Sequence, residues 1–237
     1  MTASDIANKF EQMGGEFKTT PILLSEKIKG VKALVFDWDG VWHDGKKDGS
    51  GVSSFSEVDS MGLNLLRFGY YLHHGELPKT LIITGENNIT AFDFAKREHL
   101  DGVLFKAKNK LEFFEFLLKE WQLKPEEVLF VFDDVLDLAM AKQCGVRYFV
   151  TRQGSPLLTD YTAQKNLSDY HTANAGGNNA VREVCELSLG LLGNFEEVVS
   201  SRMEFAADYM RYWDLRNTGE VRFFTKLSDT ITEVSKP

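Results

Sequence analysis

The stretch Val31-Lys-Ala-Leu-Val-Phe-Asp-Trp-Asp-Gly-Val41 constrains the fold most strongly. Its apolar run, residues 33–36, predicts a short buried strand, and Gly40 lets the chain turn sharply afterwards. Asp37 and Asp39 stand directly at the strand end, where chemistry sits in open α/β sheets. Two adjacent carboxylates are costly without a cation, so the pattern indicates a divalent metal such as Mg²⁺. The alternative interpretation is a strand followed by a turn with two solvated acids.

Composition narrows the class of protein. The 237 residues, 43% of them hydrophobic, are typical of a globular chain with one sizeable core. The net charge of −8 and the pI near 5.2 argue against binding to nucleic acid or to an anionic membrane. We find no spanning apolar run and no signal peptide in the first twenty residues. The two cysteines, Cys144 and Cys185, have no metal or redox spacing, so we expect a reduced, cytoplasmic protein.

Apolar segments alternate with amphipathic ones along the chain. Further strands are expected at 80–85, 102–105, 128–132 and 147–151, and helices at 59–72, 88–98, 108–121, 178–191 and 194–213. Such alternation predicts an α/β fold, a central parallel sheet with helices on both faces. Outside it we expect a helix at 4–13, one helical turn near 23–28, and an irregular tail from Asn217 with one strand at 221–224.

Polar side chains of complementary kinds follow several of these strands. Thr84 ends the strand at 80–85, and Asp133, Asp134 and Asp137 follow the strand at 128–132. Lys110 stands near the start of the next helix, with Lys106 and Lys108 as alternatives for the same position. Carboxylates, a hydroxyl and a lysine at one sheet edge predict a metal-assisted phosphoryl-transfer site.

In this order the motifs resemble those of the haloacid dehalogenase-like phosphohydrolases, which have a Rossmann-like fold. The motifs are Asp37-Trp-Asp39-Gly40, Thr84-Gly85, Lys110, and Asp133-Asp134 with Asp137. Within that superfamily the chain resembles the small, capless branch of 3-deoxy-D-manno-octulosonate 8-phosphate phosphatases. That narrower resemblance, over residues 31–198, rests on Asp44-Gly45, Asp59 with Gly62-Leu63, Ile83-Thr84-Gly85, and the segment from Ala175 to Cys185.

The resemblance implies a domain organisation. We expect an N-terminal helical extension over residues 1–30, a catalytic domain over 31–193, and a C-terminal helix and tail over 194–237. The segment 44–58 leaves no room for a large cap domain, so a small hairpin or loop is expected in its place. In the resembled family an oligomer, usually a tetramer, narrows the site opening instead, and we expect a homo-oligomer here.

The resemblance also implies a mechanism. Asp37 would attack phosphorus and form an aspartyl-phosphate, and Asp39 would protonate the leaving oxygen and then activate water. Thr84 and Lys110 would hold the phosphoryl oxygens. Mg²⁺ would be held by the Asp37 carboxylate, the Asp39 carbonyl and Asp133. Asp134 and Asp137 are expected to orient the metal or the lysine. Asp134 is also a candidate metal ligand.

Departures from the family pattern concern substrate choice. Glu86 and Asn178 stand where cations are expected, and Phe132 replaces a glycine before the paired aspartates. An acid at the site mouth would repel a sugar-acid carboxylate, so a substrate without one is an alternative. Our candidates for substrate binding are Gly85, Glu86, Asn178 and Asp59. For His43, which lies nearby in the sequence, a hydrogen-bonded or packed role is favoured over metal ligation.

The function predicted from the sequence is a Mg²⁺-dependent phosphatase acting on a small sugar phosphate or sugar-acid phosphate. No nucleic-acid or membrane partner is expected. The alternative is a non-catalytic binding or scaffold subunit of the same fold. Phe132 motivates it, together with the apolar stripe that runs along the expected helix at 194–213.

Overall fold

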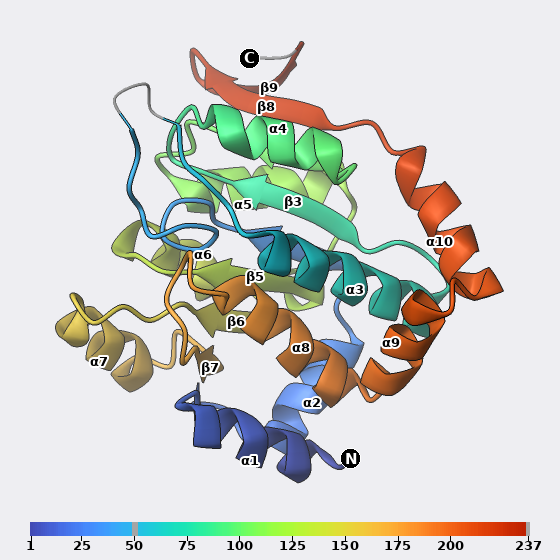
Figure 1. The fold of residues 1–237 in the computed structure, drawn as a ribbon. Helices are drawn as coiled ribbons and strands as arrows, with labels where there is room; N and C mark the ends of the chain where they lie inside the picture. The colour runs from blue at the N-terminus through green and yellow to red at the C-terminus, as the bar shows by residue number, and fades with distance from the viewer. Residues whose placement is uncertain (49–51, 236–237) are drawn as a thin grey trace.

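The computed structural model describes residues 1–48 and 52–235, which form nine strands joined in one sheet (Figure 1). The strand order is β1-β7-β6-β5-β2-β3-β4-β8-β9. The strands are β1 Glu16–Phe17, β2 Ala33–Phe36, β3 Lys79–Ile83, β4 Gly102–Leu104, β5 Val128–Phe132, β6 Val146–Phe149, β7 Tyr170–His171, β8 Arg222–Leu227 and β9 Thr230–Val234.

The sheet is parallel at its centre, as predicted. β2 lies between β3 and β5 and pairs in parallel with both, so that Phe36 is level with Ile82 on one side and Val131 on the other. Two outer pairs are antiparallel, β1 with β7 and β8 with β9. The terminal segments therefore continue the same sheet at its two opposite edges, shown at the bottom and top of Figure 1.

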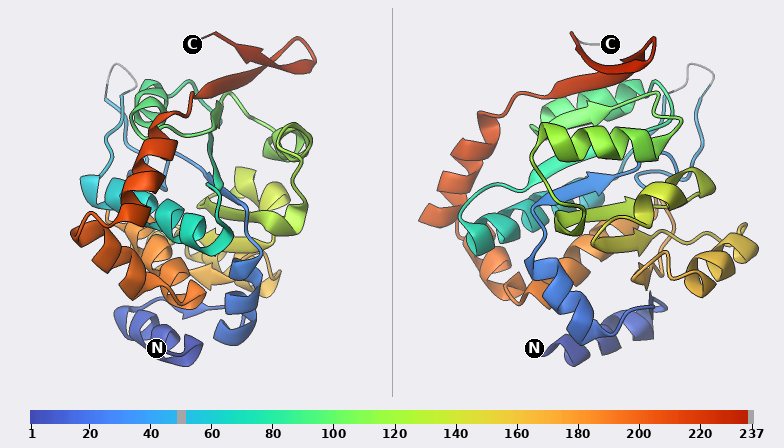
Figure 2. Two further views of the ribbon diagram at one scale, coloured as in Figure 1. Left: turned by 90° about the vertical axis from the view of Figure 1, so that its right-hand side faces the viewer. Right: turned by 180° about the vertical axis from the view of Figure 1, so that it is seen from behind.

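Helices cover both faces of the sheet, because successive residues of the central strands point to opposite sides. Leu34 and Phe36 pack into the core beneath α1–α4 and α8–α10, whereas Ala33 and Val35 pack beneath α5 and α6. The right-hand view of Figure 2 shows the layer that contains α5 and α6 in front of the sheet. The helices are α1 Ala3–Met13, α2 Pro21–Lys29, α3 Glu57–His74, α4 Ile89–Arg97, α5 Lys110–Glu120, α6 Leu138–Ala141, α7 Pro156–Gln164, α8 Ala180–Leu192, α9 Phe195–Met203 and α10 Ala207–Asn217.

The prediction of a single helix over residues 194–213 is wrong. The chain forms two helices, α9 and α10, separated by Phe205 with φ of 51°. A left-handed residue cannot continue an α-helix, so the apolar stripe is divided. Its members Val198 and Tyr209 are buried, whereas Met203 is exposed.

The other differences lie in short or peripheral elements. The turn expected near 23–28 is the full helix α2, and the irregular tail contains two strands, β8 and β9. Strands β1 and β7 are two residues long, too short to show a period of two, and were missed together with α7. Among the described residues of the loop 44–58 there is no hairpin strand, and residues 49–51 lie outside the described part. No described helix has the length and apolar character needed to cross a membrane.

Candidate active site

The carboxyl ends of β2, β3 and β5 line a pocket of about 380 Å³. Because these parallel strands are neighbours, the residues that follow them meet at one sheet edge. The side chains that line the pocket include Asp37, Asp39, Glu86, Lys110, Asp133 and Arg152. Gly85 also lines it, so the structure brings together residues from all four predicted motifs.

Lys110 connects the carboxylates of this pocket. It is the first residue of α5, and its Nζ lies 2.6 Å from Asp37 Oδ1 and also forms an ion pair with Asp137. All three side chains are buried, whereas Lys106 and Lys108 are exposed. The position of the amine therefore favours Lys110 over the two alternatives.

The buried charges change one another's proton affinity. Burial raises the pKa of Asp37 to about 7, against the opposing attraction of Lys110. Burial alone would lower the pKa of Lys110, but the carboxylates of Asp37 and Asp137 outweigh it and raise that pKa. The lysine therefore stays charged, in position to neutralise an anionic phosphoryl group beside Asp37.

Asp37, Asp133 and Asp137 form a group of acids suited to a hard cation. One oxygen from each lies within 4.8 Å of the others, and all three side chains are buried. Asp133 Oδ1 has no hydrogen-bond partner in the described structure, whereas Asp133 Oδ2 forms an ion pair with the Arg152 guanidinium. A buried carboxylate oxygen without a donor suits a cation, and carboxylate oxygens are the ligands Mg²⁺ prefers. The residues present thus fit the predicted Mg²⁺.

The structure does not bring Asp134 into this group. Its side chain is 53% exposed, and its Oδ1 accepts a hydrogen bond of 2.6 Å from the Val135 N–H. Asp137 occupies the acid group instead, because the 3-10 turn Val135–Asp137 directs its side chain back toward Lys110. Asp134 thus caps the turn, and Asp137 contacts the lysine.

Replacing Asp133 or Asp134 by asparagine tests which of the two binds the metal. We expect Asp133→Asn to weaken Mg²⁺ binding at least about tenfold, because a charged oxygen donor is lost. The same exchange at Asp134 should change the affinity less than about threefold, because its carboxylate faces solvent. Isothermal titration calorimetry of the unliganded variants with MgCl₂ measures both. Equal losses in the two variants would contradict this assignment.

Asp39 is held by hydrogen-bond donors. His43 Nδ1 accepts from the Gly45 N–H at 3.1 Å, so the ring proton is on Nε2, which donates to Asp39 Oδ1 at 3.0 Å. Asn88 donates to Asp39 Oδ2 at 2.8 Å, and Lys47 lies 3.0 Å from Oδ1. Burial would raise the pKa of Asp39, but these donors outweigh it and lower the pKa to about 2. Asp39 is therefore an ionised carboxylate, able to take a proton from water.

Thr84 joins the same network from the end of β3. Its buried hydroxyl accepts a hydrogen bond of 2.7 Å from Asn88, the residue that also donates to Asp39. Gly85 and Glu86 follow it and line the pocket. Asn88 thus bridges the motifs of β2 and β3.

Two predicted substrate-binding residues lie elsewhere. Asp59 is buried under α8, where it accepts a 2.7 Å hydrogen bond from the Arg182 N–H, and burial raises its pKa to about 6. Asn178 is exposed, and neither residue lines the pocket. The glycines before Asn178 have a packing role, because a Cβ on Gly176 would lie 2.0 Å from the Gly40 carbonyl oxygen. Residues 175–179 therefore support the loop that follows Asp39.

Sequence reasoning missed Asn88, Lys47 and Arg152. Arg152 follows the strand predicted at 147–151, so the same strand-end rule could have indicated it. Asn88 was read only as the start of a helix, and Lys47 lies in a loop without a periodic pattern. The hydrogen-bonded role expected for His43 is confirmed.

Comparison with known proteins gives a consistent result. No model of a protein family matches the chain. The 3-deoxy-D-manno-octulosonate 8-phosphate phosphatase of Escherichia coli (strain K12) is 29% identical over 175 residues, which are 72% of this chain and 86% of the relative. The enzyme of that name from Yersinia pestis is 28% identical over 168 residues, 69% of this chain and 82% of the relative.

Solved structures agree in fold. A putative hydrolase of the HAD superfamily (subfamily III A) from Legionella pneumophila superposes with a TM-score of 0.65 at 27% identity, covering 77% of this chain and 94% of that one. The 3-deoxy-D-manno-octulosonate 8-phosphate phosphatase of Moraxella catarrhalis, in complex with magnesium, phosphate and KDO, gives 0.62 at 26% identity, covering 75% and 97%. The chain has a haloacid dehalogenase-like fold and is similar over about three quarters of its length to 3-deoxy-D-manno-octulosonate 8-phosphate phosphatases.

Proposed function

We propose that this protein is a Mg²⁺-dependent phosphatase that hydrolyses a sugar-acid phosphate or a related sugar phosphate. The observation that carries the proposal is the buried group of Asp37, Lys110, Asp133 and Asp137 at the carboxyl ends of β2 and β5. The relatives and the solved structures are named as phosphatases, and one of them contains magnesium and phosphate.

Each residue has a role that follows from its position. An Asp37 oxygen attacks phosphorus in line, which divides hydrolysis into formation and breakdown of an aspartyl-phosphate. Lys110 neutralises charge on the phosphoryl oxygens, and Thr84, fixed by Asn88, lies beside them. Asp39 takes a proton from the water that attacks the aspartyl-phosphate. When bound to Asp37 and Asp133, Mg²⁺ would supply further positive charge to the transferred group.

Proton donation to the leaving oxygen depends on the donors around Asp39. Three side chains, His43, Asn88 and Lys47, keep its pKa low in the unliganded chain. For Asp39 to donate to the leaving oxygen, it must take up a proton from solvent as the substrate enters. The neutral His43 ring keeps its Nε2 proton and orients the Asp39 carboxylate through that hydrogen bond.

The charges at the pocket support a sugar-acid phosphate as the substrate class. Glu86 lines the pocket and opposes a second anionic group. Arg152 also lines it; its guanidinium pairs with Asp133 but stays partly exposed, and a guanidinium suits a carboxylate. Besides the predicted Lys110, the pocket therefore contains a second cation that was not identified from the sequence.

Phosphate release from a panel of sugar phosphates and sugar-acid phosphates tests this function. The panel is assayed with Mg²⁺ and with a chelator, and 3-deoxy-D-manno-octulosonate 8-phosphate is included. We expect turnover with Mg²⁺ and loss of turnover with the chelator. No turnover on any compound, by a chain that binds Mg²⁺, would favour the non-catalytic binding or scaffold subunit.

Glu86 gives a direct test of substrate choice. We expect Glu86→Arg to raise kcat/KM for carboxylated sugar phosphates about tenfold over sugar phosphates without a carboxylate, because one repulsive charge becomes attractive. Glu115→Arg on the exposed side of α5 makes the same charge change away from the pocket and serves as control. An unchanged ratio in Glu86→Arg would remove this residue from substrate selection.

Assembly and location form the finer part of the proposal. We propose a cytoplasmic homo-oligomer, a tetramer by likeness to the family, without nucleic-acid or membrane partners. Supporting observations are the net charge of −8 and the buried, unpaired thiols of Cys144 and Cys185. Light scattering is expected to give about four times the chain mass of 26.9 kDa. A mass of one chain at assay concentration would contradict the oligomer.

A further inference from the structure

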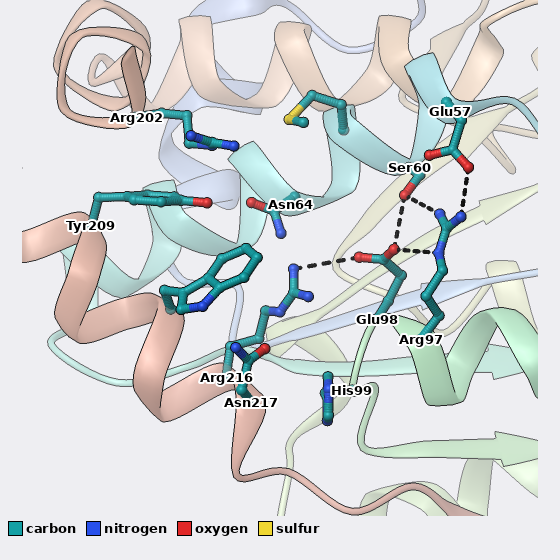
Figure 3. A pocket seen from close by; sticks show the side chains of 12 residues that line it. Glu57, Ser60, Asn64, Arg97, Glu98, His99, Arg202, Tyr209, Arg216 and Asn217 are labelled. Atoms are coloured by element: carbon teal, nitrogen blue, oxygen red, sulfur yellow. Dashed lines mark hydrogen bonds and ion pairs between the residues drawn. The ribbon is translucent and has the colours of Figure 1, made fainter. Parts of the chain in front are cut away.

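A second hollow, of about 660 Å³, lies between the start of α3, the end of α4 and helices α9 and α10 (Figure 3). Its volume exceeds the 380 Å³ of the strand-end pocket, and the two have no lining residue in common. It is within the range of small-molecule sites. Part of its wall comes from residues 202–217, beyond the segment 31–198 that carries the family motifs.

Several polar atoms in its wall have no partner in the described structure. Arg216 is 6% exposed and Asn64 is 7% exposed, yet Arg216 Nε and Asn64 Oδ1 make no hydrogen bond. Arg202 Nε is also buried without a partner. Such groups destabilise the fold when they are unsatisfied, and native proteins contain few of them. Their convergence on one hollow indicates a ligand that pairs with them.

The charge of the wall is unevenly distributed. At one end, Arg97 is neutralised by Glu98 at 2.9 Å and by Glu57 at 2.5 Å, as the dashed lines in Figure 3 show. At the other end, Arg216 pairs with one carboxylate among the described residues, that of the same Glu98, at 3.4 Å. Arg202 has no carboxylate within ion-pair distance among the described residues. The positive charge of Arg202 is therefore uncompensated, and Arg216 shares its one carboxylate with Arg97.

Aromatic rings lie beside these two guanidinium groups. The Arg202 guanidinium is 4.7 Å from the Tyr209 ring, and that of Arg216 is 5.0 Å from the Trp213 ring. Trp213 lines the hollow and is 38% exposed, so its indole offers an apolar surface to a bound molecule.

We propose that this hollow is a binding site for a small organic anion. Its carboxylate or phosphate group accepts hydrogen bonds from Arg202 and Arg216, whose planar guanidinium groups suit either oxyanion. Its apolar or ring-bearing body packs against Trp213 and Tyr209, and a ligand hydroxyl can donate to Asn64 Oδ1. The site is separate from the strand-end pocket.

The four tryptophans allow a direct test by ¹⁹F NMR of the full chain labelled with 5-fluorotryptophan. Trp213 lines the hollow, whereas Trp38, Trp42 and Trp121 line neither the hollow nor the strand-end pocket and serve as references. The probes are phenylphosphonate and benzoate, which share a ring and differ in the anion; neither contains a phosphate ester that a phosphatase could cleave. We expect a saturable shift of the Trp213 signal with at least one probe. The stronger probe distinguishes a phosphate-bearing from a carboxylate-bearing ligand.

A variant then tests the cation. Arg202→Gln is expected to weaken the binding seen at Trp213 at least about tenfold, because a charge-assisted hydrogen bond is lost. Arg211→Gln on the exposed side of α10, where the arginine pairs with Asp208, is the control and should bind within about twofold of wild type. Unshifted signals of the other tryptophans show that the variant is folded. The proposal is overturned if neither probe shifts Trp213 saturably, or if Arg202→Gln binds as tightly as wild type.

Discussion

Replacing Asp37 by asparagine is expected to lower phosphate release by at least about 10⁴-fold, because the amide cannot attack phosphorus. The exchange keeps the size of the side chain and leaves Lys110 its ion pair with Asp137. The variant should therefore fold, and circular dichroism and thermal melting can confirm this. Initial rates with Mg²⁺ and saturating substrate measure the loss.

A matched exchange shows that the effect belongs to the nucleophile. Asp44 is exposed, and its carboxylate pairs with Lys46 at 2.6 Å in the loop after the first motif. Asp44→Asn should retain activity within about threefold of wild type, because the lost pair is exposed. Undiminished turnover by Asp37→Asn would refute the assigned nucleophile.

Replacing Lys110 by methionine is expected to remove activity and to destabilise the fold. The free energy of unfolding should fall by about 3–5 kcal/mol, because two buried carboxylates, Asp37 and Asp137, lose their cation. Methionine keeps the length of the side chain, so the missing charge is the main change. Urea unfolding followed by circular dichroism measures the stability.

The exposed Lys108 provides the comparison. Lys108→Met should change the free energy of unfolding by less than about 0.5 kcal/mol and leave turnover unchanged, because this side chain lies in solvent. If both variants lose activity alike, the lysine that contacts the phosphoryl group has been misassigned. If Lys110→Met is as stable as wild type, the buried ion-pair group does not hold the site together.

Residues at strand ends were predictable because a parallel sheet leaves little freedom in where they meet. Once 33–36 and 128–132 are neighbouring parallel strands, Asp37 and Asp133 must emerge at the same edge. Lys110 was chosen over Lys106 and Lys108 by its place in the family motif, and the structure puts it at the first residue of α5, beside Asp37 and Asp137. These positions depend on the order of the elements more than on their detailed packing.

Positions that depend on detailed backbone geometry were not predictable. Asp134 and Asp137 are three residues apart, and only the 3-10 turn decides which carboxylate faces Lys110. Asp59 and Asn178 matched a motif, but Asp59 accepts a hydrogen bond from the start of α8 and Asn178 is exposed outside the pocket. The chain does not continue as one helix past Phe205, because this residue has a left-handed backbone conformation. The apolar spacing of the sequence continues through this position and therefore gave no sign of the break. The same break shapes part of the second hollow.

The most direct test of the account is to trap the covalent intermediate. The wild-type chain is mixed with Mg²⁺ and ³²P-labelled 3-deoxy-D-manno-octulosonate 8-phosphate, quenched in acid at intervals, and digested for peptide mapping. We expect acid-stable, hydroxylamine-sensitive label on the peptide that contains Asp37, and none in the Asp37→Asn chain. Turnover by wild type with no label at any quench time, together with full turnover by Asp37→Asn, would contradict it.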